Sequence, residues 1–159
     1  MLQLIPPPAH RLALRVAFRL RSRFRRVFKP DLAGVSVVLF DGEGRIMLAR
    51  HTYGPEGWAL LSGGLKRGED PEAGLRREVR EELGCELTAL EVLETFEERV
   101  SGAPHTAHVY SARLAGEAVP DNREIAHLRW FRREELHGVT LTRLTRARLV
   151  SLGLYSSDS

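Results

Sequence analysis

Three glutamates cluster in the sequence RREVREELG (residues 76–84), where Glu81 and Glu82 follow Glu78 at three and four residues. On a helix this spacing places the carboxylates side by side, and each like-charged pair is destabilising by about 0.2–0.5 kcal/mol. Such a cluster needs either neighbouring arginines or a bound cation. Oxygen ligands of this kind suit Mg²⁺ or Mn²⁺, which would also share their coordination with the phosphates of a substrate.

The negative charges of this helix can be compensated in two ways. In the first, the face is exposed and salt-bridged, because Arg77 and Glu81 stand four residues apart, as do Glu72 and Arg76. In the second, a cation joins the carboxylates to a preceding loop.

That loop has the sequence SGGLKRGE. Gly63 and Gly64 mark a point where the chain turns tightly or approaches a ligand closely. Backbone carbonyls freed at this point would be further oxygen ligands for the cation.

The helix that carries the glutamates has clear ends. Asp70 suits its N-cap, Pro71 its first turn and Gly84 its termination. A ridge of apolar residues would bury one face of the helix against a sheet: Leu75, Val79 and Leu83.

The elements around it follow from composition and turn signals. Residues 34–40 and 45–51 read as strands joined by the turn DGEG, which predicts a hairpin. The segment WALL (58–61) reads as a short buried strand and residues 62–70 as a polar loop. Further strands are expected within 85–100, 105–114 and 126–131, and helices within 132–136 and 141–154. Strands with helices between and after them predict an α/β sandwich with a mixed sheet.

Composition bounds the class of protein. A chain of 159 residues, 43% hydrophobic and 28% charged, is expected to form one globular domain. With Cys85 as its single cysteine it has no disulfide framework or cysteine zinc site, which favours a reducing, cytoplasmic location. No apolar run approaches the ~18 residues of a membrane span, and arginines interrupt any signal-like stretch.

The N-terminal thirty residues form a basic arm. They hold eight of the 24 basic residues and none of the 21 acidic ones, so the remaining chain has 16 basic against 21 acidic residues. Apolar residues recur at every fourth position, with arginines on the other side, which predicts a basic amphipathic helix: Leu12, Val16, Leu20, Phe24 and Phe28.

We expect this apolar stripe to pack on the domain or on a partner subunit, as in a homodimer, with the arginines solvated. Binding of residues 11–29 to a membrane surface or to nucleic-acid phosphates is a less favoured alternative. An organelle transit peptide would share this composition.

The helix and its loop form a longer pattern. From Gly63 the chain reads Gly, five residues, Glu69, seven residues, Arg77-Glu78-Val79, one residue, Glu81-Glu82, one residue, Gly84-Cys85. This pattern resembles the signature box of the Nudix hydrolases. The box covers 23 residues directly, and the flanking strands extend the resemblance over roughly 31–155. It implies a Nudix-type α/β/α sandwich at residues 31–159, preceded by the arm at 1–30.

The resemblance also implies a chemistry. Members of the family hydrolyse a diphosphate linkage in a nucleoside diphosphate joined to another group. By position, Glu78, Glu81 and Glu82 match the glutamates that bind Mg²⁺ or Mn²⁺, and Gly63 or Gly64 matches a residue whose carbonyl adds a ligand. Glu69 and Arg77 match a pair that braces the loop against the helix.

A further glutamate often comes from a later loop, and Glu124 is the candidate for an additional metal ligand or the general base. The base remains open between Glu78, Glu82 and Glu124. Three other glutamates are read as surface charges: Glu97, Glu98 and Glu117. Leu61 and Ser62 depart from the proline and glycine usual before the box, and Cys85 stands at an aliphatic position, where we expect it buried and inert.

Residues flanking the box are candidates for substrate binding. Tyr53 or Trp58 would stack on a base and Arg50 would hold a phosphate; alternatively, Trp58 belongs to the core and Tyr53 to loop packing. Three histidines lack metal-ligand spacing: His105, His108 and His127.

No later motif identifies the substrate. Pro104 lies 19 residues after Cys85, further than an ADP-ribose-type pattern expects. A nucleoside triphosphate, a nucleotide sugar or an ADP-ribose-like molecule stays open, as does a catalytically silent module that senses a nucleotide.

Overall fold

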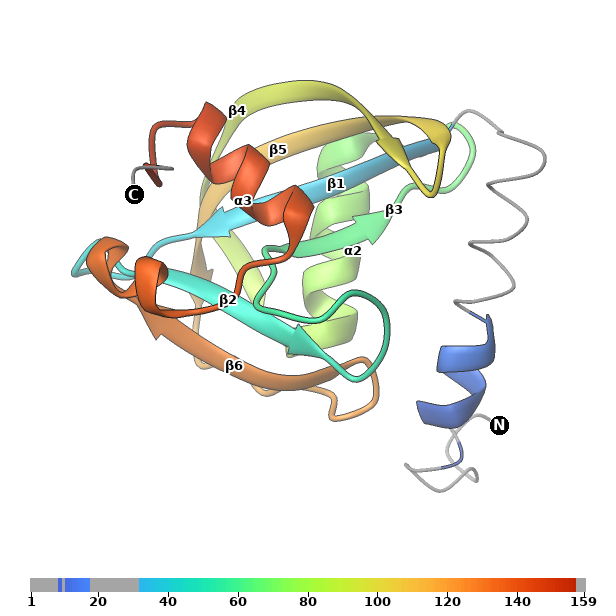
Figure 1. Ribbon diagram of the computed structural model, residues 1–159, viewed down its shortest axis with the longest axis horizontal. Helices are drawn as coiled ribbons and strands as arrows, with labels where there is room; N and C mark the ends of the chain where they lie inside the picture. Colours follow the sequence, from blue (N-terminus) through green and yellow to red (C-terminus); the bar gives the residue numbers. More distant parts are fainter. Residues whose placement is uncertain (1–8, 10, 18–31, 157–159) are drawn as a thin grey trace.

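The computed structural model describes residues 9, 11–17 and 32–156 of the chain (Figure 1). Residues 11–17 are helical. The strands are β1 (Leu32–Leu39), β2 (Ile46–His51), β3 (Leu61–Gly64), β4 (Glu86–Val100), β5 (Ala103–Ala115) and β6 (Ile125–Phe131). The helices are α2 (Pro71–Leu83), the 3₁₀ helix η2 (Arg133–Gly138) and α3 (Arg143–Ser151). In the described part of the chain, no helix is long and apolar enough to cross a membrane.

The strands form two sheets. One has the order β3-β1-β5-β4, in which β1 is antiparallel to β3 and parallel to β5. The other consists of β2 and β6, paired antiparallel. Figure 1 shows α2 behind the four-stranded sheet and α3 in front of it. The expected α/β sandwich with a mixed sheet is therefore confirmed.

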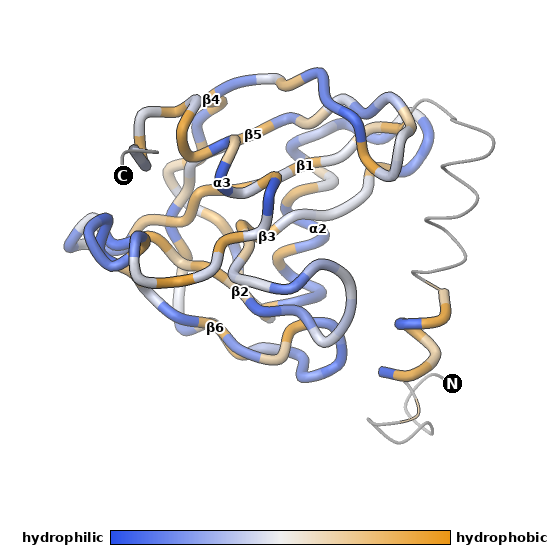
Figure 2. The backbone as a smooth tube through the Cα atoms, in the orientation of Figure 1, coloured by the Kyte–Doolittle hydropathy of each residue, from blue (hydrophilic) through white to orange (hydrophobic). Residues whose placement is uncertain are grey.

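The core lies on both faces of the larger sheet, because successive side chains of a strand point to opposite faces. Val35 and Val37 of β1 pack in the cluster that includes Leu75 of α2. Val38, the next residue of β1, points to the other face and packs in the cluster that includes Leu149 of α3. Figure 2 accordingly shows hydrophobic residues along the central strands and hydrophilic residues in the outer loops.

The ends of α2 are those that the sequence predicts. The side chain of Asp70 accepts a hydrogen bond from the Ala73 amide at 2.9 Å, and Pro71 begins the helix. Gly84 closes it in the left-handed conformation at φ 65°, which favours glycine. The apolar ridge is buried, as expected. Local capping signals therefore fix the position of the helix that carries the glutamates.

The turn predicted between residues 34–40 and 45–51 is present, but the predicted pairing of these two strands as a hairpin is wrong. The Asp41 amide donates to the Arg45 carbonyl at 3.1 Å, and Phe40 and Ile46 form one isolated bridge. The two strands then diverge into different sheets. Both strands are largely buried, so pairing within a larger core replaces the local pairing that the turn indicated.

Part of the predicted loop after WALL is also a strand. β3 begins at Leu61 and continues through Gly64, paired with Gly34–Val37 of β1. The glycine pair at residues 63–64 thus sits at the edge of the sheet. This pairing brings the loop that precedes α2 against the face of the helix.

The helix at residues 11–17 contacts the domain through its arginines. Arg11 donates to the Asn122 carbonyl at 2.7 and 3.1 Å, and Arg15 Nε donates to the Thr52 carbonyl at 3.1 Å. Leu12 and Val16 are 63% and 48% exposed. Leu12 and Val16 therefore do not pack on the domain, because the helix meets polar loops that offer carbonyl acceptors. Packing of the stripe on a partner subunit stays a prediction. Residues 18–31 lie outside the described residues.

Candidate active site

Four carboxylates lie near enough to a buried one for their charges to raise its pKa. Glu82 of α2 is only 6% exposed. Burial raises its pKa to about 9, and the charges of Glu78, Glu124, Asp121 and Glu81 contribute to the rise. Glu78 and Glu81 come from the same helix, whereas the other two come from the segment before β6. The site predicted from spacing along one helix is therefore completed by a distant segment.

Glu78 lies at the edge of this cluster. Burial raises its pKa, although the hydrogen bond from Arg77 Nη1 at 2.7 Å opposes the rise. Among the described residues no Lys, Arg or His forms an ion pair with Glu82. A buried carboxylate with like charges around it is costly unless a cation accompanies it. Hard oxygen donors in this number fit Mg²⁺ or Mn²⁺.

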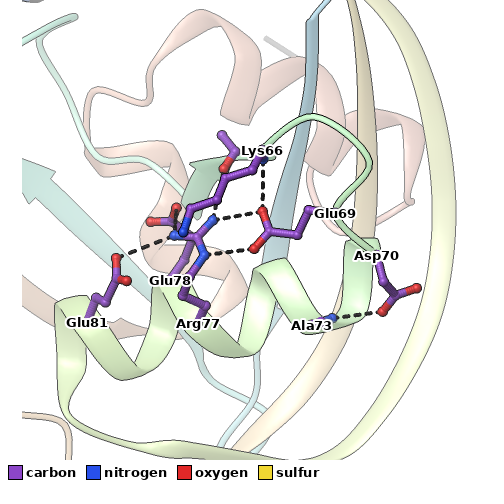
Figure 3. A network of polar contacts seen from close by, with 8 residues as sticks. Lys66, Glu69, Asp70, Ala73, Arg77, Glu78 and Glu81 are labelled. Atoms are coloured by element: carbon purple, nitrogen blue, oxygen red, sulfur yellow. Dashed lines mark hydrogen bonds and ion pairs between the residues drawn. The ribbon is translucent and has the colours of Figure 1, made fainter.

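Arg77 joins the loop to the helix (Figure 3). Its Nε and Nη2 donate to the two carboxylate oxygens of Glu69 at 2.8 and 3.0 Å, and Nη2 also reaches the Gly64 carbonyl at 3.2 Å. The hydrogen bond from Arg77 lowers the pKa of Glu69 to about 2. Arg77 Nη1 also lies 3.4 Å from Glu81, whose side chain is 60% exposed. The contact between Glu69 and Arg77 expected from the sequence is present.

Gly63 lies directly beneath Glu78. A Cβ atom at residue 63 would stand 2.2 Å from Glu78 Cγ and 2.3 Å from its Cδ. A Cβ at Gly64 would meet nothing within 4 Å. The two glycines therefore differ, because only the first must lack a side chain for the carboxylate of Glu78 to keep its place.

Asp121 shapes the segment that carries Glu124, and sequence reasoning missed it. Its Oδ1 accepts hydrogen bonds from the amides of residues 123, 124 and 125 at 3.0, 3.1 and 3.2 Å. Its own amide donates to the Glu82 carbonyl at 3.1 Å, which ties the segment to the end of α2. The Asp-Asn pair at 121–122 was the available signal, since Asp and Asn side chains commonly bond amides a few residues on.

We predict that Asp121→Ala loosens this segment. Losing the shared acceptor leaves partly buried amides unpaired, which costs about 1–3 kcal/mol. Urea unfolding should show this loss, and kcat/KM should fall because Glu124 is no longer held. Asp121→Asn keeps an acceptor oxygen and should retain most of the stability. Equal destabilisation by both variants would contradict this role for Oδ1.

Of the three candidates for substrate binding, two line a cavity and the third does not. Tyr53 OH donates to Glu124 Oε2 at 2.9 Å, and both Arg50 and Tyr53 line a cavity of about 490 Å³. Trp58 does not line this cavity. Its ring packs edge-on against Phe131 at 4.9 Å, which supports the alternative in which Trp58 belongs to the core.

The glutamates read as surface charges also differ. Glu98 is not one of them, since its side chain is 15% exposed, binds Arg148 and lies 3.1 Å from His105 Nδ1. Glu117 is exposed, and its carbonyl accepts from Cys85 Sγ at 2.8 Å. Cys85 is buried, as expected. Burial raises the pKa of its thiol.

Two carboxylates of the cluster are held by protein partners. Arg77 holds Glu78, and Tyr53 holds Glu124. Across residues 9, 11–17 and 32–156, no three acidic, histidine or cysteine side chains converge as a ready group of metal ligands. The hydrogen bond from Arg77 uses Oε1 of Glu78, so ion binding would engage the other carboxylate oxygen or displace Arg77.

The buried carboxyl predicts how metal-free protein responds to pH. The pKa of Glu82 is about 9 in the folded protein against an ordinary value of 4.5, so the folded state holds a proton that the unfolded state has lost. Stability should thus fall as the pH rises between these values. Calorimetry in EDTA should show Tm decreasing with pH, and Glu82→Gln should flatten the slope. A slope unchanged by that substitution would contradict the assignment.

Comparisons with known proteins agree with the geometry. The family model described as the NUDIX domain matches residues 30–151. An RNA pyrophosphohydrolase of Teredinibacter turnerae is 38% identical over 66 residues, which cover 42% of this chain and 37% of that protein. The nucleoside triphosphatase NudI of an Enterobacter species is 32% identical over 111 residues, covering 63% and 79% respectively. This chain spans about a third of the length of the first RNA pyrophosphohydrolases that it matches.

A solved structure shows the same architecture. The MutT NUDIX hydrolase from Burkholderia pseudomallei superposes with a TM-score of 0.68 at 27% identity, covering 80% of this chain and 99% of that one. The sandwich, the braced loop and the glutamate helix are thus accompanied by similarity along most of the chain. The chain belongs to the Nudix hydrolase family.

Proposed function

We propose that this protein hydrolyses a diphosphate linkage in a nucleoside diphosphate derivative and depends on Mg²⁺ or Mn²⁺. The observation that supports it most is the burial of Glu82 beside Glu78 and Glu124, with no basic partner for Glu82 among the described residues. This arrangement is costly in the metal-free protein and becomes favourable when a divalent ion and a phosphate chain complete it.

Some residues of the site would hold the metal ion, and others would hold the loop and helix in place. Glu78, Glu81 and Glu82 would hold the ion, together with the carbonyl of Gly63 or Gly64. When bound, the ion polarises the phosphorus and lowers the pKa of an attacking water. Arg77 does not touch the substrate in this proposal, since Glu69 and the Gly64 carbonyl engage it.

We assign the general base to Glu124. It comes from a separate segment, it approaches the cluster from outside α2, and Tyr53 OH orients its carboxylate at 2.9 Å. Glu124→Gln should lower kcat by about 10²–10⁴-fold, the usual contribution of a general base. Metal affinity, measured by calorimetry with Mn²⁺, should stay close to that of the unaltered protein. A large loss of Mn²⁺ affinity would instead make Glu124 a ligand.

The substrate class follows from the cluster and from the relatives. Two relatives are named for acting on RNA pyrophosphate and on nucleoside triphosphates. We therefore propose a nucleoside 5′-phosphoanhydride as partner, a class that includes nucleoside triphosphates, nucleotide sugars and ADP-ribose-like molecules.

The experiment that tests this function is a substrate panel. The full chain is incubated with Mg²⁺ and nucleoside triphosphates, nucleotide sugars, ADP-ribose and a 5′-triphosphorylated oligonucleotide, and the products are identified by mass spectrometry. Cleavage between phosphates that stops in EDTA supports the proposal. Binding without cleavage across the panel would make the protein a nucleotide-sensing module.

A further inference from the structure

A polar cavity of about 490 Å³ lies beside the candidate active site. Most of its lining comes from one stretch of chain at and after the end of β2, residues 50–57. Among the described residues, the other lining residue is Arg15, from the N-terminal helix. This helix begins outside the 30–151 match, so the cavity has one wall that the family domain does not supply.

The charged lining of the cavity is mainly basic. Among the described lining residues, Arg15 and Arg50 carry fixed positive charges, and Glu56 carries a negative one. His51 also lines the cavity, and burial lowers its pKa, which favours the neutral ring. The balance among these residues favours an anion.

The cavity adjoins the carboxylate cluster. Tyr53 belongs to its lining and donates to Glu124 Oε2 at 2.9 Å. The side chain of Tyr53 thus lies between the cavity and Glu124, and a phosphate chain with two phosphates at the cluster would extend toward the cavity with its next phosphate or phosphodiester. The combined site suits such a phosphate chain. Its acidic end, the carboxylate cluster, attracts phosphates only through a metal ion, whereas its basic end, the cavity, attracts them directly.

Arg15 keeps donors for such a group. Its Nε donates to the Thr52 carbonyl at 3.1 Å, which uses one of the five N–H groups of a guanidinium. The apolar residues beside it, Leu12 and Val16, are exposed, so burial of those side chains does not hold the helix here. Arg11 and Arg15 hold the helix against the loops, and Arg15 also lines the cavity.

We propose that Arg15 and Arg50 form an anion subsite that binds a phosphate of the substrate beyond the metal-bound diphosphate. The N-terminal helix is then part of the substrate site. This inference rests on the proposed function for the position of the diphosphate. It adds that substrates with three or more phosphates, or with a phosphodiester after the diphosphate, are favoured.

The subsite is tested first without metal or turnover. Binding of inorganic tripolyphosphate to the full chain is measured by calorimetry in EDTA. Arg15→Gln should weaken it by about 10-fold, the loss expected for a hydrogen bond between charged groups, and Arg15→Lys should restore part of it. The matched control is Arg11→Gln, which removes the contact with the Asn122 carbonyl but no lining residue of the cavity. Because Arg11 also holds the helix that carries Arg15, Arg11→Gln should lose some affinity, but clearly less than Arg15→Gln.

Turnover then distinguishes the source of the phosphate. With Mg²⁺, Arg15→Gln should raise KM about 10-fold for substrates that use the subsite, with kcat retained. A rise for a nucleoside triphosphate identifies a mononucleotide chain, whereas a rise confined to a 5′-triphosphorylated oligonucleotide identifies a phosphodiester.

Two results would overturn the subsite. One is equal loss of tripolyphosphate affinity in Arg11→Gln and Arg15→Gln, which would leave the arginines only a docking role. The other is no tripolyphosphate binding by the unaltered chain. Either result leaves metal-dependent hydrolysis standing. Conversely, binding that depends on Arg15 without any cleavage in the panel would remove the proposed function alone.

Discussion

Glu82→Gln is expected to reduce turnover by about 10³-fold or more, since removing one preorganised group that stabilises charge already costs about 10²–10³ in kcat. The amide cannot supply the negative charge that the ion requires. The fold should persist, because Glu82 with a pKa of about 9 is uncharged in the metal-free protein near neutral pH, and glutamine has the same shape. Steady-state kinetics in Mg²⁺ and the Tm in EDTA measure the two effects separately.

Glu72→Gln is the matched control on the same helix. Glu72 accepts hydrogen bonds from Arg76 at 2.9 and 3.0 Å, away from the cluster. An exposed pair of this kind contributes about 0.2–1 kcal/mol, so turnover should be unchanged and stability nearly so. If the Glu82 variant turned over substrate as fast as this control, the account of a metal site at Glu82 would fail.

Gly63→Ala is expected to have the second large effect. The added Cβ would stand 2.2 Å from Glu78 Cγ, so the side chain of Glu78 must leave its place. Overpacking of this kind destabilises by about 1–3 kcal/mol. Turnover should fall much further, by about 10²-fold, since small displacements of catalytic groups cost that much. Urea unfolding and kcat/KM in Mg²⁺ measure the two losses.

Gly64→Ala separates this effect from a general intolerance of the loop. A Cβ at residue 64 meets nothing within 4 Å, and its carbonyl still accepts from Arg77. Both its stability and its turnover should match those of the unaltered protein. Equal losses in the two alanine variants would mean that the loop backbone, rather than the position of Glu78, controls activity.

The sequence alone was sufficient for the helix, whereas residues 62–64 of the predicted loop belong to a strand. Asp70, Pro71 and Gly84 fix the ends of α2 through contacts within a few residues, so the spacing of the glutamates carries directly into space. The contact between Glu69 and Arg77 joins the loop to the helix across eight residues, and it was expected from the resemblance to the Nudix box. Local capping and helical periodicity also placed the apolar ridge correctly.

The tertiary structure decided how distant residues join them: Glu124 was a candidate from the Nudix resemblance, whereas Asp121 was not. The turn at 41–45 indicated a hairpin, but β1 and β2 enter different sheets because each pairs with strands that lie far along the chain. The same long-range pairing brings Asp121 and Glu124 to α2, and it buries Glu98 with Arg148. Arg15 is held beside the cavity by its hydrogen bond to the carbonyl of Thr52, 37 residues along the chain. Such contacts depend on packing between elements, which the short-range periods of a single sequence do not encode.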